Sequence, residues 1–219
     1  YLSSDQMLIY TLVEDKNRTI WAGGFTSGLL KYEPETDRFI KIEGSGNGLS
    51  DNDVIEIIPI DSNMLWVCTW AGGIQTYDIK GNRFEELLIN NKRLNRARTS
   101  TIDKRGNIWL GTDQGAYKIE KSGEVQHYVS ETTSEEKLSG DRVFDIKEDK
   151  KGNIWFATNM GLTKLDVVAN KTSLFYAQKG LPNDFIYSIL IDDEDNIWMG
   201  TNHGISVLNT QTNTLKNSI

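Results

Sequence analysis

Hydrophobic and polar positions recur along this chain with a period of 43 to 46 residues. Each period has an apolar run, a short polar turn, a second apolar run with a tryptophan, and a glycine-containing turn before a third apolar run. Five tryptophans mark the copies: Trp21, Trp66, Trp109, Trp155 and Trp198. A period of this length indicates a repeat architecture, in which one supersecondary unit occurs five times.

The polar turn before each tryptophan predicts a tight hairpin. Its sequence is Lys-Arg-Gly-Asn at 104–107 and Lys-Lys-Gly-Asn at 150–153, and glycine and asparagine tolerate the backbone conformations of such turns. Four copies place an aspartate six residues before the tryptophan: Asp15, Asp103, Asp149 and Asp192. The second copy has Ile60 there and Asp61 one residue later. We interpret these aspartates as turn-forming carboxylates.

The third apolar run predicts that each small sheet is covered on both faces. Its apolar residues stand one and four positions beyond the turn glycine, and side chains at these offsets point to opposite faces of a strand. A fourth, more polar strand is expected near Phe39, Phe84, Val125, Leu174 and Leu215. Four antiparallel strands covered on both faces form a blade of a β-propeller, so we predict an all-β fold with very little helix.

The five blades are expected at about residues 2–42, 49–87, 94–128, 138–176 and 181–216. We expect residues 1–219 to form a single propeller segment, because one blade cannot bury its own faces. The third blade departs from the pattern, since Arg98, Thr99 and Ser100 replace apolar residues of the first strand. That strand is predicted to be the weakest, or to face polar surroundings.

Composition argues against two classes of protein, nucleic-acid-binding proteins and membrane-spanning segments. The formal net charge is −7 and the pI is near 5.0, whereas a nucleic-acid-binding protein needs a basic surface. The sequence has no apolar run of about 18 residues, so no membrane span is expected in this segment. Its single cysteine, Cys68, lies in a predicted strand and is interpreted as a small buried residue.

The repeats resemble the two-component regulator propeller repeat. The residues that carry the resemblance are a lead of the form Leu-Ser/Pro-x-Asp, followed by Gly-Asn-Ile-Trp, a small residue and a glycine turn. The lead stands at Leu2, Leu49, Leu138 and Leu181. Residues 149–162, DKKGNIWFATNMGL, and residues 192–205 are close copies of the later part.

This resemblance implies the periplasmic sensor region of a hybrid two-component system of Bacteroides-type bacteria. Such proteins combine seven-bladed or double propellers with one membrane span and a cytoplasmic histidine kinase, tend to be homodimers, and sense oligosaccharides. The present chain is therefore expected to be part of a larger propeller in a longer protein. Its expected partners are an oligosaccharide and the other blades and sensor domains of the same protein. No cofactor is expected.

Candidate binding residues lie in the loops that lead into the first strands and in the turns after the second strands, which a propeller places on one face. They are Trp70, Arg142, Asp184, Phe185 and His203, whose aromatic and charged groups suit sugar rings and hydroxyls. The alternative interpretation is that they only cap the blades.

The sequence offers few candidate catalytic residues, because its two histidines, His127 and His203, have no catalytic partner at a recognisable spacing. We therefore predict a non-catalytic sensor module without a metal site. The carboxylates of residues 192–195 are the best candidates for a calcium site, but no EF-hand spacing occurs, so calcium is not expected there. Two alternatives remain: a propeller enzyme, either a lyase or a glycosidase, and a structural scaffold that docks another domain.

Overall fold

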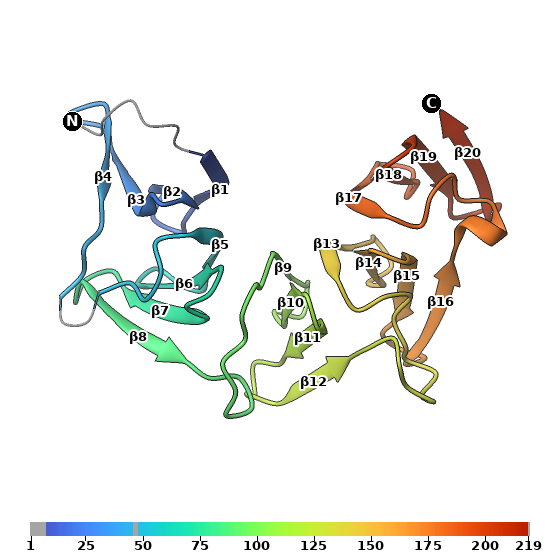
Figure 1. Ribbon diagram of the computed structural model, residues 1–219, viewed down its shortest axis with the longest axis horizontal. Coiled ribbons are helices and arrows are strands. Elements are labelled where there is room, and N and C mark those ends of the chain that lie inside the picture. The colour runs from blue at the N-terminus through green and yellow to red at the C-terminus, as the bar shows by residue number, and fades with distance from the viewer. Residues whose placement is uncertain (1–7, 46–47, 219) are drawn as a thin grey trace. The chain divides into compact units, whose positions relative to one another are not determined.

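The computed structural model describes residues 8–45 and 48–218, and it is built from β-strands. The lead sequence at Leu2 lies outside the described residues. The one helical element among them is a single 3₁₀ turn, η1, at Ala177–Lys179. Twenty strands form five antiparallel sheets of four, each in chain order (Figure 1). The predicted all-β architecture of five four-stranded blades is confirmed.

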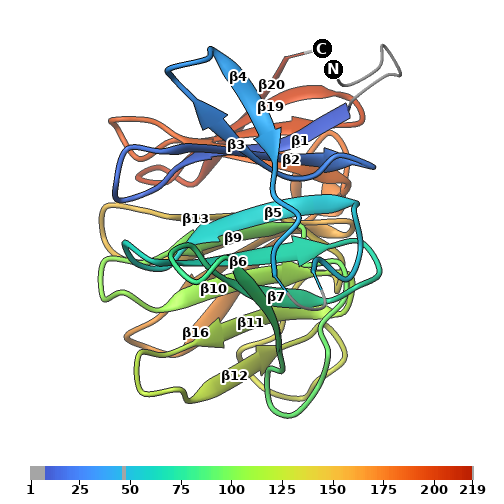
Figure 2. The ribbon, with the colours of Figure 1, turned by 90° about the vertical axis from the view of Figure 1, so that its left-hand side faces the viewer.

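The first two sheets belong to one compact unit, residues 1–97, and the last three to a second, residues 98–219. The strands of the first unit are β1 (Leu8–Glu14), β2 (Ile20–Phe25), β3 (Gly28–Glu33), β4 (Arg38–Lys41), β5 (Val54–Pro59), β6 (Met64–Thr69), β7 (Ile74–Asp78) and β8 (Arg83–Leu87). In this unit the sheet of β1–β4 lies face to face with the sheet of β5–β8 (Figure 2).

The second unit repeats the same four-stranded sheet three times. Its strands are β9 (Thr99–Ile102), β10 (Ile108–Thr112), β11 (Gly115–Ile119), β12 (Val125–Tyr128), β13 (Val143–Glu148), β14 (Ile154–Thr158), β15 (Gly161–Asp166), β16 (Lys171–Phe175), β17 (Ile186–Ile191), β18 (Ile197–Thr201), β19 (Gly204–Asn209) and β20 (Thr214–Ser218). Strand β9 has four residues, against six in β13 and β17, which agrees with the weak first strand predicted for this repeat.

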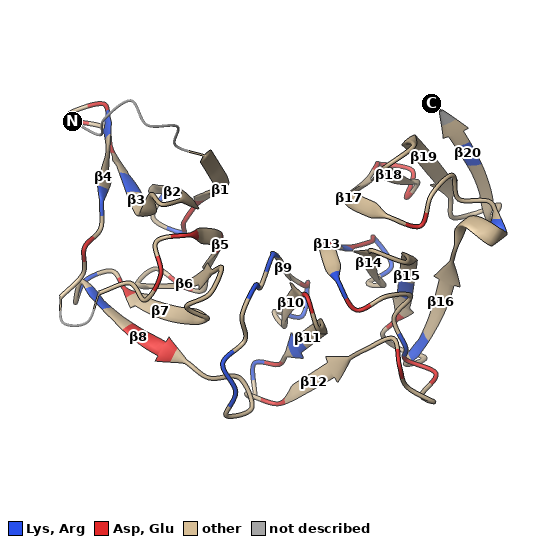
Figure 3. Ribbon diagram, in the orientation of Figure 1, with Lys and Arg blue, Asp and Glu red and all other residues tan. Residues whose placement is uncertain are grey.

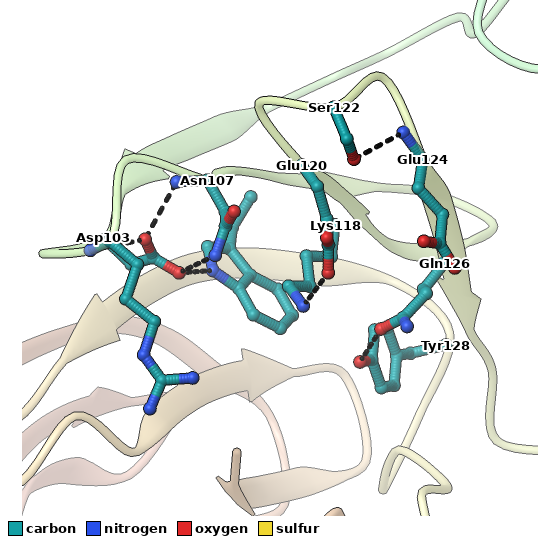
Figure 4. A network of polar contacts seen from close by, with 10 residues as sticks. Asp103, Asn107, Lys118, Glu120, Ser122, Glu124, Gln126 and Tyr128 are labelled. Atoms are coloured by element: carbon teal, nitrogen blue, oxygen red, sulfur yellow. Dashed lines mark hydrogen bonds and ion pairs between the residues drawn. The ribbon is translucent and has the colours of Figure 1, made fainter. Parts of the chain in front are cut away.

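All five tryptophans occupy the second strand of their sheet, as predicted, and four of them form an equivalent hydrogen bond. The indole Nε1 atoms of Trp21, Trp109, Trp155 and Trp198 donate to the aspartate six residues earlier, over 2.9–3.0 Å. Figure 4 shows one of these aspartates, Asp103, facing the side-chain amide of Asn107. The aspartate thus closes the hairpin turn and also satisfies the indole N–H group, which is buried in Trp21, Trp109 and Trp155.

Trp21, Trp109 and Trp155 each pack against the sheet that follows them in the chain. In the second unit, Trp109 lies in one cluster with Val143 and Ile146 of β13, and Trp155 lies in another with Ile186 and Ile189 of β17. The corresponding cluster of the first unit joins Trp21 of β2 to β5 and β6. The two clusters of the second unit bury both faces of the sheet of β13–β16, as the apolar pattern predicts.

Small residues two positions after the tryptophans let neighbouring sheets approach. A Cβ atom on Gly111 would lie 2.7 Å from Cγ1 of Val143, in the first strand of the next sheet. A Cβ atom on Gly23 would lie 2.3 Å from the same atom of Val54. The second repeat has Cys68 at this place, buried and without a disulfide, as expected for a small apolar filler.

Candidate functional site

The first strands of four sheets contain a β-bulge close to their beginning. In β13, Val143 pairs with Thr158 and Asp145 pairs with Ala157, so Phe144 has no partner residue on β14. The residues at this bulge position are Tyr10, Ile55, Phe144 and Tyr187. A bulge changes the direction of a side chain and is often found beside functional sites. Here it adds an apolar or aromatic side chain at the start of each strand.

The third sheet lacks the bulge but places an arginine at the corresponding position. Thr99 pairs with Gly111 there, and the preceding residue, Arg98, donates its amide to the carbonyl of Gly111 over 2.8 Å. The position directly before the paired residue is therefore apolar in four repeats and cationic in one. This variation distinguishes it from the tryptophan position of the second strand, which is the same in all five repeats.

The loop before a first strand is called here the lead-in loop. Backbone hydrogen bonds join the lead-in loops of β5, β13 and β17 to the turn after the second strand of the preceding sheet. The amide of Gly28 donates to the carbonyl of Asn52, that of Gly115 to Asp141, and that of Gly161 to Asp184, over 2.7–2.9 Å. Lead-in loops and glycine turns of adjacent sheets therefore lie together within each unit. This arrangement confirms the expectation that these two kinds of loop share one end of the sheets.

Three aromatic rings meet at this end of the second unit. Phe144 of β13 lies 5.0 Å from the ring of Phe185 and 5.5 Å from the ring of Tyr187, and the latter two rings are 4.9 Å apart. Tyr187 is 50% exposed and Phe185 is partly buried. The three rings form an aromatic cluster, open to solvent at Tyr187, of the kind that can stack on an apolar sugar face.

A cluster of charged side chains lies beside the lead-in loop of β13. The guanidinium of Arg98 holds both carboxylate oxygens of Asp113, with distances of 2.6 Å from Nε and 3.1 Å from Nη2. Arg142, two residues before Phe144, reaches the same carboxylate at 3.5 Å and has 49% of its side chain exposed. Because 3.5 Å is long for a charge-assisted hydrogen bond, the Arg142 donors are not fully engaged by Asp113.

The other predicted binding residues are placed as follows. Asp184 accepts a hydrogen bond from the amide of Ala177, a contact that caps the loop between the fourth and fifth sheets. His203 is exposed in the turn between β18 and β19, where its amide donates to Thr201 Oγ1 at 3.0 Å. Trp70 lies in the first unit, in the turn after β6, and is 38% exposed.

Sequence reasoning missed Tyr10, Phe144 and Tyr187 as candidate site residues. A signal was present, because each follows directly after another apolar residue at the start of a first strand. Two adjacent apolar residues interrupt the alternation of a half-buried strand, and such an interruption indicates a bulge. Arg98 was noted only as an exception to the apolar pattern, although its place in the repeat corresponds to these three residues.

Charge does not favour one sheet over another. Figure 3 shows acidic and basic residues in the strands or loops of all five repeats. Within the described residues, no group of three or more His, Cys, Asp and Glu side chains is placed to hold a metal ion. The carboxylate of Asp192, the best calcium candidate, accepts hydrogen bonds from Trp198 and Asn196 instead. No helix in the described part of the chain has the length and apolarity to cross a membrane.

A four-stranded antiparallel sheet that is repeated five times, with its strands in chain order, is typical of β-propeller blades. Two stretches, residues 137–160 and 180–203, match the two-component regulator propeller family. Both stretches begin in or just before a lead-in loop and end in the turn after the second strand, so they include the aromatic cluster and Arg142. The resemblance seen in the sequence is thereby confirmed for the fourth and fifth repeats. No curated protein sequence matches the chain significantly.

Solved structures with the same fold include two extracellular domains described as parts of hybrid two component systems from B. thetaiotaomicron. The domain from BT4673 is 21% identical with a TM-score of 0.80, over 99% of this chain and 28% of that one. The domain from BT3049 is 24% identical with a TM-score of 0.73, over 98% and 29%. The present chain thus spans less than a third of these two neighbours.

An enzyme shares the fold as well. A streptogramin B lyase structure is 18% identical with a TM-score of 0.67, over 98% of this chain and 70% of that one. At these identities the likeness concerns the fold, which hosts both sensors and enzymes. Whether this chain is a sensor or an enzyme therefore has to be argued from the residues of its candidate site.

Proposed function

We propose that this chain is the ligand-binding propeller segment of an extracytoplasmic sensor in a hybrid two-component signalling protein, and that it recognises an oligosaccharide. The family match in two repeats and the two extracellular sensor domains of the same fold support the sensor role. In this proposal the whole protein has a periplasmic sensor region and a cytoplasmic histidine kinase region, and it acts as a homodimer.

The observation that carries the proposal is the variation at the bulge position. A position that only capped the sheets would repeat one residue type, as the turn aspartates and glycines do. Here the second unit has Arg98, Phe144 and Tyr187 at equivalent places, with Arg142 and Phe185 beside them. Aromatic faces and guanidinium donors next to one another suit a ligand with apolar ring faces and oxygen acceptors, which describes a saccharide.

A catalytic role has less support, because the histidines occupy unsuitable places. His127 lies on the outer strand β12 and stacks on Tyr117, with ring centroids 4.1 Å apart. Its Nε2 atom lies 2.7 Å from the carbonyl of Gln114. His203 is on an exposed turn and makes its described hydrogen bond through the backbone. General acid–base chemistry needs a positioned pair within hydrogen-bond reach of the substrate.

A thermal-shift screen of neutral and acidic oligosaccharides tests the proposal, followed by calorimetric titration of any glycan that binds. We expect Arg142→Ala and Tyr187→Ala each to weaken binding about tenfold, the effect of a residue worth about 1.4 kcal/mol. Arg83→Ala is the matched control, since it removes an arginine that is also about half exposed or more, on the outer strand β8.

The outcomes separate the alternatives. Equal affinity of the wild-type protein and both variants would place the glycan site elsewhere. Turnover of a bound glycan would favour the enzyme, and a screen without any small ligand would favour a scaffold that docks another domain.

A further inference from the structure

A small cup in the first unit has three aromatic walls and one carboxylate. It is lined by Tyr10, Phe25, Asp53, Ile55 and Trp70, and its volume is about 120 Å³. Two of these residues, Tyr10 and Ile55, occupy the bulge position of their strands. The cup therefore depends on the same kind of bulge that exposes side chains in the second unit, but it combines aromatic rings with a carboxylate.

The carboxylate of Asp53 is held in place by its surroundings. Its Oδ1 atom accepts a hydrogen bond of 2.8 Å from the amide of Thr26, and its carbonyl accepts one of 2.9 Å from the amide of Trp70. Its own amide donates to Asp51 Oδ1 at 3.1 Å. These bonds come from the lead-in loop itself and from the turns of both neighbouring hairpins. A negative charge thus stands in a defined position at the wall of an otherwise aromatic and aliphatic cup.

The aromatic walls favour a cation. Tyr10 is 57% exposed, Phe25 46% and Trp70 38%, so all three rings are accessible to a ligand from solvent. The π face of an aromatic ring attracts cations, and tryptophan does so most strongly. The Trp70 ring already has the guanidinium carbon of Arg96 4.5 Å from its centroid, and Arg96 is not among the residues that line the cup.

The size of the cup restricts the ligand to a compact group. A water molecule takes about 30 Å³ in the liquid, so the cup accommodates only a few heavy atoms. Pockets for drug-sized ligands are about 300–1,000 Å³, well above this value. From the volume, the three rings and the adjacent carboxylate, we propose that this cup binds the head group of a quaternary alkylammonium compound.

This site does not depend on the proposed oligosaccharide function, because all of its residues lie in the first unit and the aromatic cluster lies in the second. A saccharide could fail to bind to the second unit while an ammonium ligand binds here, or the reverse. Separate titrations with the two kinds of ligand therefore distinguish the failure of one proposal from the failure of the other.

Choline and 3,3-dimethylbutan-1-ol provide a matched pair of probes, since they have the same shape and differ in the positive charge. Both are titrated into the full chain by isothermal calorimetry, with the indole resonance of Trp70 followed by NMR. We expect choline to bind at least tenfold more tightly than the neutral alcohol and to shift the Trp70 resonance. Equal affinities, or no binding of choline, would overturn the proposal.

Asp53→Asn tests the carboxylate, because it removes the charge and retains an oxygen that can accept from Thr26. We expect this variant to bind choline about tenfold more weakly and the neutral alcohol unchanged. Glu35→Gln is the control, as it removes the same charge from an exposed turn outside the cup. If Asp53→Asn fails to fold, Tyr10→Leu gives the second measurement on a side chain that is more than half exposed. Unchanged choline affinity in the folded variant contradicts the proposal.

Discussion

An aspartate and a tryptophan six residues apart form the same hydrogen bond in four of the five repeats. In Trp21, Trp109 and Trp155 the buried indole N–H group has no access to water, and the aspartate supplies the acceptor it needs. The same carboxylate also accepts from the turn, as in the 2.9 Å bond from the amide of Asn153 to Asp149. One side chain thus joins the shape of a turn to the packing of a large ring.

The burial of these rings predicts unequal costs of removal. Trp155 is 1% exposed and packs against the fifth sheet, so Trp155→Ala should lower the free energy of unfolding by about 3–5 kcal/mol. Trp198 has the equivalent place in its own sheet but is 43% exposed, so Trp198→Ala should cost clearly less. Chemical denaturation of both variants measures the difference. A loss below about 1 kcal/mol for Trp155→Ala would contradict the packing role.

At the scale of the element, the turn after the second strand depends on glycine. Gly161 has φ of +122°, and a Cβ atom there would lie 2.3 Å from the carbonyl oxygen of Phe175. Its amide also donates to Asp184 of the next lead-in loop. The backbone therefore needs both a positive φ and a close approach, which no other residue provides without strain.

Alanine at two glycines should separate these two requirements. Gly123 also has a positive φ, +89°, but no atom lies within 4 Å of its would-be Cβ, so Gly123→Ala should cost about 1–3 kcal/mol of backbone strain. Gly161→Ala adds a collision with backbone atoms and should cost about 1–3 kcal/mol more. Urea unfolding of the two variants gives the comparison, and equal losses would show that the collision is relieved by a small shift.

The elements show clearly which features were accessible from sequence. The hairpin around Trp155 was predictable because Asp149, Gly152 and Asn153 are local determinants of one turn. The aromatic cluster was not, since it needs Phe144 to be turned by a bulge and to meet Phe185 from a different strand. Contacts of this kind depend on register between neighbours, which the periodicity of a single strand does not determine.

At the scale of the molecule, the number of sheets and their strand order followed from the spacing of five tryptophans. The site was predicted less completely. Arg142 and Phe185 were named from the sequence as unusual residues in repeated loops, and Trp70 as an aromatic one. Their partners, Asp113 for Arg142 and Tyr10 for the Trp70 cup, come from other repeats or strands and became apparent only in the folded chain.

The buried and turn aspartates predict loss of stability in acid. Hydrogen bonds from Trp198 and Asn196 lower the pKa of Asp192 to about 2, from 3.8. Burial tends to raise the pKa of Asp103, but hydrogen bonds from Trp109, Asn107 and nearby amides outweigh it and lower the pKa on balance. Below about pH 3.8 the unfolded chain protonates these groups before the folded chain does. Stability is therefore full above this pH and is lost as the pH falls towards 2.

Denaturant midpoints measured between pH 5 and pH 2 test this expectation. The midpoint of the wild-type protein should decrease across the range, and Asp192→Asn should decrease less steeply because it carries no proton-linked carboxylate at that turn. Asp193→Asn removes the neighbouring exposed carboxylate and serves as the control. Parallel slopes for all three proteins would mean that the Asp192 hydrogen bonds do not contribute to acid stability.

The hydrogen bonds between glycine turns and lead-in loops also bear on how such a protein can change. The amides of Gly28, Gly115 and Gly161 bind main-chain carbonyls, so these joints between adjacent sheets depend on no particular side chain in the lead-in loop. Residues such as Arg142 and Phe185 can then be exchanged while the joints persist. A lineage of related chains could acquire new ligands by substituting loop residues one at a time, with each intermediate retaining the same scaffold.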